Sequence, residues 1–267
     1  MQASVAIIRL GLLTLFIAAA NVSQACTITL DEDGRWNSDD CTLAELFRRI
    51  GPELEYISVE DAQGLCDATI TQHDMPAGPF PSPYVISNPG IYCVAEDLEV
   101  YMDVDGSAIE IQSGGVGLWF LRHELRNSNP GSNGIALGPG LGSAPSNHDG
   151  IRIVTGTTDI HVSRGSISGF RSAILTDSQG ANIARVSIDH MEFATNYLAI
   201  ALNGVFQPSI RENTFEDCQH TIGVAESEDV VIADNTVLSD EVLSIPSSPH
   251  VPYLLASITL WHVNGAR

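Results

Sequence analysis

The 267-residue sequence predicts an all-β protein, a right-handed parallel β-helix (solenoid) that follows a short, disulfide-stapled N-terminal cap containing one helix. Three observations predict this fold class. A short apolar motif recurs at intervals of 26, 22 and 22 residues between residues 160 and 237. Apolar and polar residues alternate within it, as they do in strands. Four of the five cysteines lie early in the chain, soon after an export signal.

Residues 1–25 have the features of a signal peptide. Leu10–Ala20 is apolar, and the small residues Ser23 and Ala25 occupy the −3 and −1 positions of a cleavage site. Cys26 directly after the cut leaves a lipoprotein open, but a lipid-attachment box has Leu where this chain has Ser23, so we expect simple export to the periplasm, the cell surface or the medium. Spanning a bilayer takes about 20 apolar residues, so we predict no transmembrane segment.

Residues 26–83 are expected to form the cap and a lead-in to the solenoid. Thr42 and Glu45 form a capping box that opens an amphipathic helix ending near Ile50. A parallel β-helix has an open apolar end, and a short helix can cover it.

The early cysteines are expected to form two disulfides, because exported proteins keep such bonds. Three pairings of Cys26, Cys41, Cys66 and Cys93 are possible, and proximity favours Cys26–Cys41 with Cys66–Cys93. Cys218 falls within a repeat, where we expect it to be a buried small apolar residue.

The repeats define the main domain, residues 84–240. Each six-residue motif begins and ends on an apolar residue: Val162–Ile167, Ile188–Phe193, Ile210–Phe215 and Ile232–Val237. Seven positions after the first three motifs come Ile174, Ile200 and Ile222. Two short strands per repeat cannot bury an apolar face alone, so we expect successive repeats to stack on a shared core.

Several features mark bends and ends of this stack. Asn213 and Asn235 occupy the same repeat position and are expected to form an asparagine ladder at a bend. Residues 138–149 form a long Gly- and Pro-rich loop, a length that is often functional. Residues 241–267 are expected either to cover the end of the stack or to be a truncated coil.

Three stretches resemble the right-handed parallel β-helix proteins of the pectate-lyase-like superfamily: Tyr84–Tyr92, Asn133–Leu137 and the Ile-x-x-Asn-x-Phe motifs. Cys41–Glu45 is also similar to the cap segment of some exported members. The resemblance implies the fold for residues 84 to 240. It does not imply one function, because the superfamily includes lyases, hydrolases, epimerases, tailspikes and adhesins.

The charge balance limits the function classes. The chain has 33 Asp and Glu against 12 basic residues, all of them Arg, and a net charge of −21. The absence of lysine excludes Schiff-base chemistry, and the negative charge predicts no binding to nucleic acid. The carboxylates are expected to be a solvated surface, with Ca²⁺ binding as the alternative.

One candidate catalytic set follows from stacking the motifs. It places four residues in one column, Arg164, His190, Glu212 and Asp234, beside a second column, Ser163, Asp189, Arg211 and Ala233. An Arg, a His and two acids on one face could bind or deprotonate a uronate. The simpler interpretation is that Asp189–Arg211 and His190–Glu212 are surface ion pairs.

A candidate substrate-binding set surrounds the long loop: His148 and Asp149 on the loop itself, with Arg152 and Arg171 beside it. His161 and His220 are isolated in the sequence, and we expect them on the surface or in a turn. No spacing of Cys and His indicates zinc.

Two functions remain open from the sequence. The favoured one is a non-catalytic β-helix for surface display, adhesion or glycan binding, because no complete catalytic motif is present. The alternative is a lyase or epimerase acting on an acidic polysaccharide. That alternative must overcome the repulsion between a uronate polymer and a chain this acidic.

Overall fold

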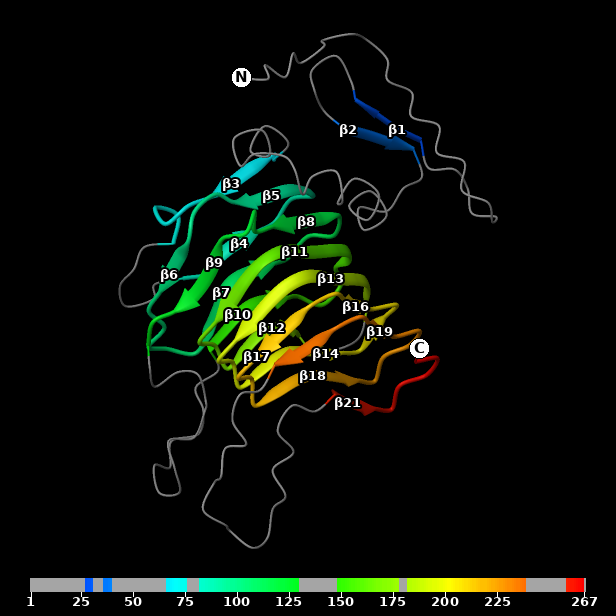
Figure 1. The fold of residues 1–267 in the computed structure, drawn as a ribbon. Coiled ribbons are helices and arrows are strands. Elements are labelled where there is room, and N and C mark those ends of the chain that lie inside the picture. The colour runs from blue at the N-terminus through cyan, green and yellow to red at the C-terminus, as the bar shows by residue number, and fades with distance from the viewer. Residues whose placement is uncertain are drawn as a thin grey trace, which may run out of the picture.

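The computed structural model confirms a parallel β-helix (Figure 1). It describes residues 66–75, 82–129, 148–177, 182–238 and 258–266, together with the backbone of two earlier strands. In these residues the chain forms strands and turns, and no helix. In Figure 1 the strands follow one another along the stack in the order of their colours, from cyan at β3 to red at β21, so each coil stacks on the one before it.

One face of the solenoid is a seven-stranded parallel sheet in the order β21-β18-β14-β12-β10-β7-β4. Its strands are β4 (Tyr84–Ile86), β7 (Gly106–Ile111), β10 (His148–Ile153), β12 (Ser172–Thr176), β14 (Leu198–Asn203), β18 (His220–Ala225) and β21 (Ile258–Trp261). We refer to it as the seven-stranded face.

The other strands form a twelve-stranded sheet that bends around a corner. The long strands β11 (Thr158–Ser168) and β13 (Ile183–Ala194) cross this corner and pair with different strands on its two sides. Before the corner lie β3 (Ala68–Ile70), β5 (Gly90–Val94), β8 (Val116–Trp119), β15 (Val205–Phe206), β16 (Ser209–Arg211) and β19 (Val231–Ala233). After it lie β6 (Leu98–Val100), β9 (Glu124–Asn127), β17 (Thr214–Glu216) and β20 (Thr236–Leu238). A central coil therefore has three strand segments, one more than the two short strands per repeat that the sequence predicts.

The register confirms the predicted stacking of the motifs. Ile188 aligns with Ile210 and Phe193 with Phe215 in neighbouring strands. On the seven-stranded face Ile174, Ile200 and Ile222 align in the same way. Parallel pairing in register places like residues above one another, so each coil buries its apolar side chains against those of the next.

The core fills the centre of the solenoid. The rings of Phe193 and Phe215 stack with centroids 5.2 Å apart, and both side chains are fully buried. Burying one such side chain contributes about 2 to 3 kcal/mol. Cys218 is buried at the edge of this core, and burial raises the pKa of its thiol to about 11. The prediction that Cys218 is a buried residue is confirmed.

The corner between the two parts of the bent sheet has a left-handed backbone in successive coils. The residues there are Arg122, Arg164, His190, Glu212 and Asp234, with φ between 52° and 70°. The predicted asparagine ladder follows directly and is confirmed: Asn213 donates from Nδ2 to Ile188 O and to Asn235 Oδ1, both at 3.0 Å. These bonds satisfy the backbone where the strand pairing is interrupted.

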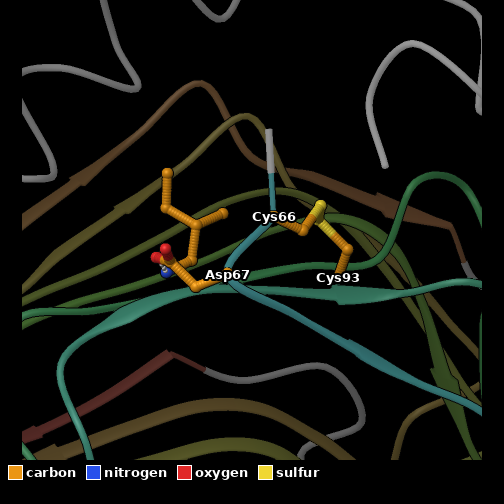
Figure 2. Close-up of a disulfide and its surroundings, with 4 residues drawn as sticks. Cys66, Asp67 and Cys93 are labelled. Carbon is orange, nitrogen blue, oxygen red and sulfur yellow. Dashed lines mark hydrogen bonds between the residues drawn. A yellow bond between two sulfur atoms is a disulfide. The ribbon is translucent and has the colours of Figure 1, made fainter. Parts of the chain in front are cut away.

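The Cys66–Cys93 disulfide links the start of the solenoid to β5, with Cys66 two positions before β3 (Figure 2). Beside it the Ile91 amide donates to the Asp67 carboxylate at 2.8 Å. This confirms one disulfide of the pairing that proximity favours. Cys26, Cys41, the predicted signal peptide and the predicted helix near Thr42–Ile50 lie outside the described residues.

Four described strands lie beyond residues 84–240. The strands β1 (Thr27–Leu30) and β2 (Trp36–Asp39) pair as an antiparallel hairpin, and β3 joins the bent sheet through β5. Near the other end, β21 pairs with β18 and extends the seven-stranded face. The stretch that was expected to be a cap or a truncated coil thus contributes one more stacked strand.

Candidate functional site

A hollow of about 380 Å³ opens on the outer side of the seven-stranded face, near the start of its strands. Its polar and aromatic lining comes from Asp105, Asp149, Arg152, Arg171, Ser172 and Tyr197. Three of the four residues that the sequence assigned to substrate binding therefore lie around one hollow: Asp149, Arg152 and Arg171.

His148 and Asp149 lie in a strand, whereas the sequence predicted that they belong to the long loop. Both residues belong to strand β10 and not to the long loop, whose residues 138–147 lie outside the described part. Asp149 reaches the hollow from the start of β10, where the strand lies beside Ser172 of β12. His148 is buried, and this burial lowers the pKa of its imidazole. It is not part of the lining of the hollow.

Asp149 is the buried acid of this site, with 5% of its surface exposed. Burial raises the pKa of its carboxyl to about 6, although a hydrogen bond from Ser172 and the charges of Arg171 and Arg152 act in the opposite direction. Its Oδ1 has no hydrogen-bond partner among the residues that the structure describes. A buried carboxyl with an unused acceptor in a hollow is typical of a functional site.

Arg152 stands next to Asp149 on the outer side of the same strand, where its neighbours in register are Glu110 and Leu175. Its Nη2 contacts Asp177 at 3.4 Å. Its Nε is buried and has no hydrogen-bond partner within the described ranges. Arg152 therefore presents one donor that its ion pair does not use.

A second hollow of about 560 Å³ continues from the first across β14 to β18. The two share four residues: Arg152, Leu175, Leu198 and Ala201. We refer to both together as the groove. It crosses the five strands from β7 to β18, which at about 4.8 Å per strand is about 19 Å.

The floor of the groove is made by one outward position of successive coils, occupied by Leu175, Ala201 and Gly223. The decrease in side-chain size deepens the groove toward β18. A Cβ on Gly223 would come no closer than 3.8 Å to any neighbour, and the residue has no positive φ. Neither packing nor backbone conformation therefore requires glycine here, and its effect is to leave space in the groove.

Tyr197 provides the aromatic side chain of the groove and was not predicted. Its ring meets the edge of the His220 ring, with centroids 5.3 Å apart and an angle of 72° between the planes. His220 begins strand β18 and is partly exposed, so it lies at the surface, in a strand and not in a turn. In the alignment of the two coils His220 lies opposite Leu198, one position after Tyr197.

The candidate catalytic column lies at the corner of the bent sheet. The alignment of Ser163 with Asp189 and of Asp189 with Arg211 confirms the predicted register. His190 Nε2 lies 2.6 Å from Glu212 Oε2, which confirms the predicted ion pair. Arg211, in contrast, donates from Nε to Ser209 at 3.1 Å.

Asp189 connects two histidines at this corner. His161 Nε2 lies 3.2 Å from one of its oxygens and His190 Nδ1 lies 3.1 Å from the other. Burial acts to raise the pKa of Asp189, but the bonds from the two imidazoles hold it well below its usual value. The bond to Asp189 raises the pKa of His190 in return. The expectation that His161 is isolated on the surface is wrong, because it is a buried residue of β11.

The two candidate sets are not brought together. In each coil a strand segment and a turn lie between the corner residue and the groove. For example, the end of β13 and a turn separate His190 from Leu198. None of Arg164, His190, Glu212 and Asp234 lines either hollow. Half of the side-chain surface of His190 and of Glu212 is exposed, as in surface ion pairs.

The described part of the chain contains no group of three or more His, Cys, Asp or Glu side chains placed to hold a metal ion. Ca²⁺ binding through carboxylates stays a prediction. No helix in the described ranges has the length and apolar character needed to cross a membrane.

Comparison with known proteins gives no further assignment: no family model, no curated protein and no solved structure matches this chain.

Proposed function

We propose that this protein is an exported glycan-binding protein of the pectate-lyase-like superfamily, with a role in surface display or adhesion. The glycan lies in the groove on the seven-stranded face and is held there without being cleaved. The observation that carries the proposal is the groove itself, which crosses five strands over a floor of Leu175, Ala201 and Gly223.

The chemistry of the groove suits a sugar. Ligand sites are concave and mostly apolar, with a few polar groups that fix orientation. Here Leu198 and the floor residues supply the apolar surface, and Asp149 and Arg152 supply the polar groups at one end. Tyr197 adds an aromatic ring with a polar hydroxyl, which can contact both the apolar and the polar parts of a ligand.

Export and the superfamily assignment rest on the sequence. Residues 1–25 have the pattern of a signal peptide, and Tyr84–Tyr92 resembles the lead-in strand of the superfamily. The Cys66–Cys93 disulfide is consistent with an oxidising compartment.

Two variants test the groove. Ala201→Phe and Gly223→Val place bulk on its floor, where the side chains point away from the core. We expect both to fold and to weaken glycan binding tenfold or more in a glycan array followed by calorimetry. Ala233→Phe adds the same bulk as Ala201→Phe at an outward position of β19, on the bent sheet, and serves as the control. Unchanged binding in both groove variants would place the glycan elsewhere.

The alternative is a lyase or epimerase that acts on an acidic polysaccharide, with Arg164 and His190 as the reacting groups. One observation favours it, the Asp189–His190–Glu212 contacts that orient the imidazole. Release of ultraviolet-absorbing unsaturated products from a uronate polymer, lost in His190→Ala, would support this alternative over a purely binding role.

A further inference from the structure

Three residues that line the groove each have a buried polar atom with no hydrogen-bond partner in the described part of the chain. Within the described residues these are Oδ1 of Asp149, Nε of Arg152 and Oδ1 of Asn203, all buried. Asp149 and Arg152 line the first hollow, and Arg152 and Asn203 line the second. Buried polar atoms are nearly always hydrogen-bonded, so three such atoms in one groove indicate a ligand that completes them.

The three atoms differ in hydrogen-bonding character. Arg152 Nε is a donor, whereas the Asp149 and Asn203 oxygens are acceptors. A hydroxyl group both donates and accepts, so neighbouring hydroxyls on one sugar ring can serve a donor and an acceptor at once. A ligand carboxylate only accepts. It could pair with Arg152 but would bring a second negative charge toward Asp149.

The charges that face Asp149 come from three elements. Arg152 lies on the same strand, Arg171 lies in the turn before β12, and Asp105 lies before β7. Above pH 6 the Asp149 carboxylate and Asp105 balance the two arginines. The first hollow then has no excess positive charge with which to attract an anionic sugar.

We propose that the groove selects neutral, polyhydroxylated stretches of a glycan. Asp149 accepts a hydrogen bond from one sugar hydroxyl, and Nε of Arg152 donates to the hydroxyl next to it. This inference rests on the proposed glycan-binding function and adds the class of glycan to it.

Matched oligosaccharide pairs test the proposal by calorimetry with the full-length purified protein. Cellohexaose is compared with the β-1,4-linked glucuronate hexasaccharide, and mannohexaose with its mannuronate counterpart. We expect at least one neutral member to bind about tenfold more tightly than its acidic partner.

The pH dependence gives a second readout with a definite sign. A neutral sugar that donates to Asp149 binds the ionised carboxyl, and the pKa of this carboxyl is about 6. Roughly a tenth of it is ionised at pH 5, so affinity should be about tenfold lower at pH 5 than at pH 7.5. An acidic sugar would show the opposite trend, because protonation of Asp149 removes the repulsion.

Two conservative variants test whether Asp149 and Arg152 bind the sugar directly or only maintain the shape of the groove. Asp149→Asn keeps an acceptor but loses its charge, and Arg152→Lys keeps the charge but loses the Nε donor; each should weaken binding of the neutral sugar about tenfold. Asp149→Asn should also remove the pH dependence. Glu192→Gln makes the same charge change at an exposed position of β13 and should leave binding unchanged.

The outcomes separate this inference from the proposed function. Tighter binding of the acidic sugar, with a further gain in Asp149→Asn, overturns the neutral-glycan selectivity and leaves glycan binding intact. Equal affinity for both members, unaffected by Asp149→Asn, also overturns it. Failure of every glycan to bind overturns the proposed function together with this inference.

Discussion

At the scale of single residues, the buried carboxyl of Asp149 is unfavourable for the stability of the fold at neutral pH. Its carboxyl is buried, its Oδ1 has no partner in the described part, and burial raises its pKa to about 6. In the unfolded chain the same carboxyl has a pKa near 3.8. Retaining a buried acid that destabilises the folded state at neutral pH is typical of functional sites.

Replacement of Asp149 by Asn should stabilise the protein in a pH-dependent way. Below pH 3.8 the carboxyl is protonated in both states, and the folded state pays no charge penalty. Above pH 6 it is ionised in both, and the folded state is destabilised by about 3 kcal/mol. Urea denaturation of Asp149→Asn should therefore show a gain of up to about 3 kcal/mol at pH 7.5 and little gain at pH 4. An equal gain at both pH values would contradict the assignment of a raised pKa.

At the scale of structural elements, the corner of the bent sheet explains the column of charged residues. Arg164, His190, Glu212 and Asp234 each occupy a left-handed position, and the ladder of Asn213 and Asn235 follows. A left-handed residue turns the chain between two strand segments. The column repeats because the corner repeats, and its ion pairs are a consequence of stacking.

Asn213 should be the most sensitive residue of this corner. Its Oδ1 accepts from the Met191 amide and its Nδ2 donates to Ile188 O, both at 3.0 Å and both buried. Asn213→Ala leaves these backbone groups without partners, so we expect a loss of about 2 to 4 kcal/mol in urea denaturation. Glu216→Ala, at an exposed position of the next strand, should change stability by less than about 0.5 kcal/mol. Similar losses in the two variants would show that the ladder does not stabilise the corner.

At the scale of the whole molecule, the coils differ in how many neighbouring strands stabilise them. The central strands β11 and β13 are paired on both sides, whereas β21 is the outermost strand of its sheet. Half of Ile258 and 60% of Trp261 are exposed on β21, in contrast to the fully buried Ile174 and Ile200. In a solenoid each repeat is stabilised mainly by its neighbours, so stability should decrease from the centre toward β21.

Hydrogen exchange measures this gradient directly. We expect the slowest exchange at the amides of β11 and β13 and the fastest at those of β19, β20 and β21. The Cys66–Cys93 disulfide should slow exchange around β3 and β5, and reduction should remove this effect. Uniform protection in all strands would indicate that the solenoid unfolds as a single cooperative unit.

Much of the fold could be predicted because each repeat carries the same short pattern of apolar residues and asparagine. The spacing of Ile188, Ile210 and Ile232 gives the stacking register, and the shared position of Asn213 and Asn235 gives the ladder. The third strand segment per coil was missed, because the corner residue divides one six-residue motif between two faces.

The groove was predicted only in part. The sequence predicts a shared site for Asp149, Arg152 and Arg171 from their places around a long loop, whereas in the structure they come together because β10 and β12 pair in parallel. Tyr197 and the floor residues Ala201 and Gly223 were missed, since small outward residues carry no chemical signature in a single repeat. Their place on the floor of one groove can be recognised only when three coils are aligned.

By itself the sequence determined the parallel β-helix, the stacked isoleucines and the ladder, because each depends on one residue type recurring at one spacing. Only the tertiary structure decided which charged residues share a hollow. That outcome depends on the direction of side chains from several coils and on burial, as with Asp149 and Arg152, which line the same hollow. His190 and Glu212 lie at an exposed corner, although by residue type they were as good candidates for a functional site as Asp149 and Arg152.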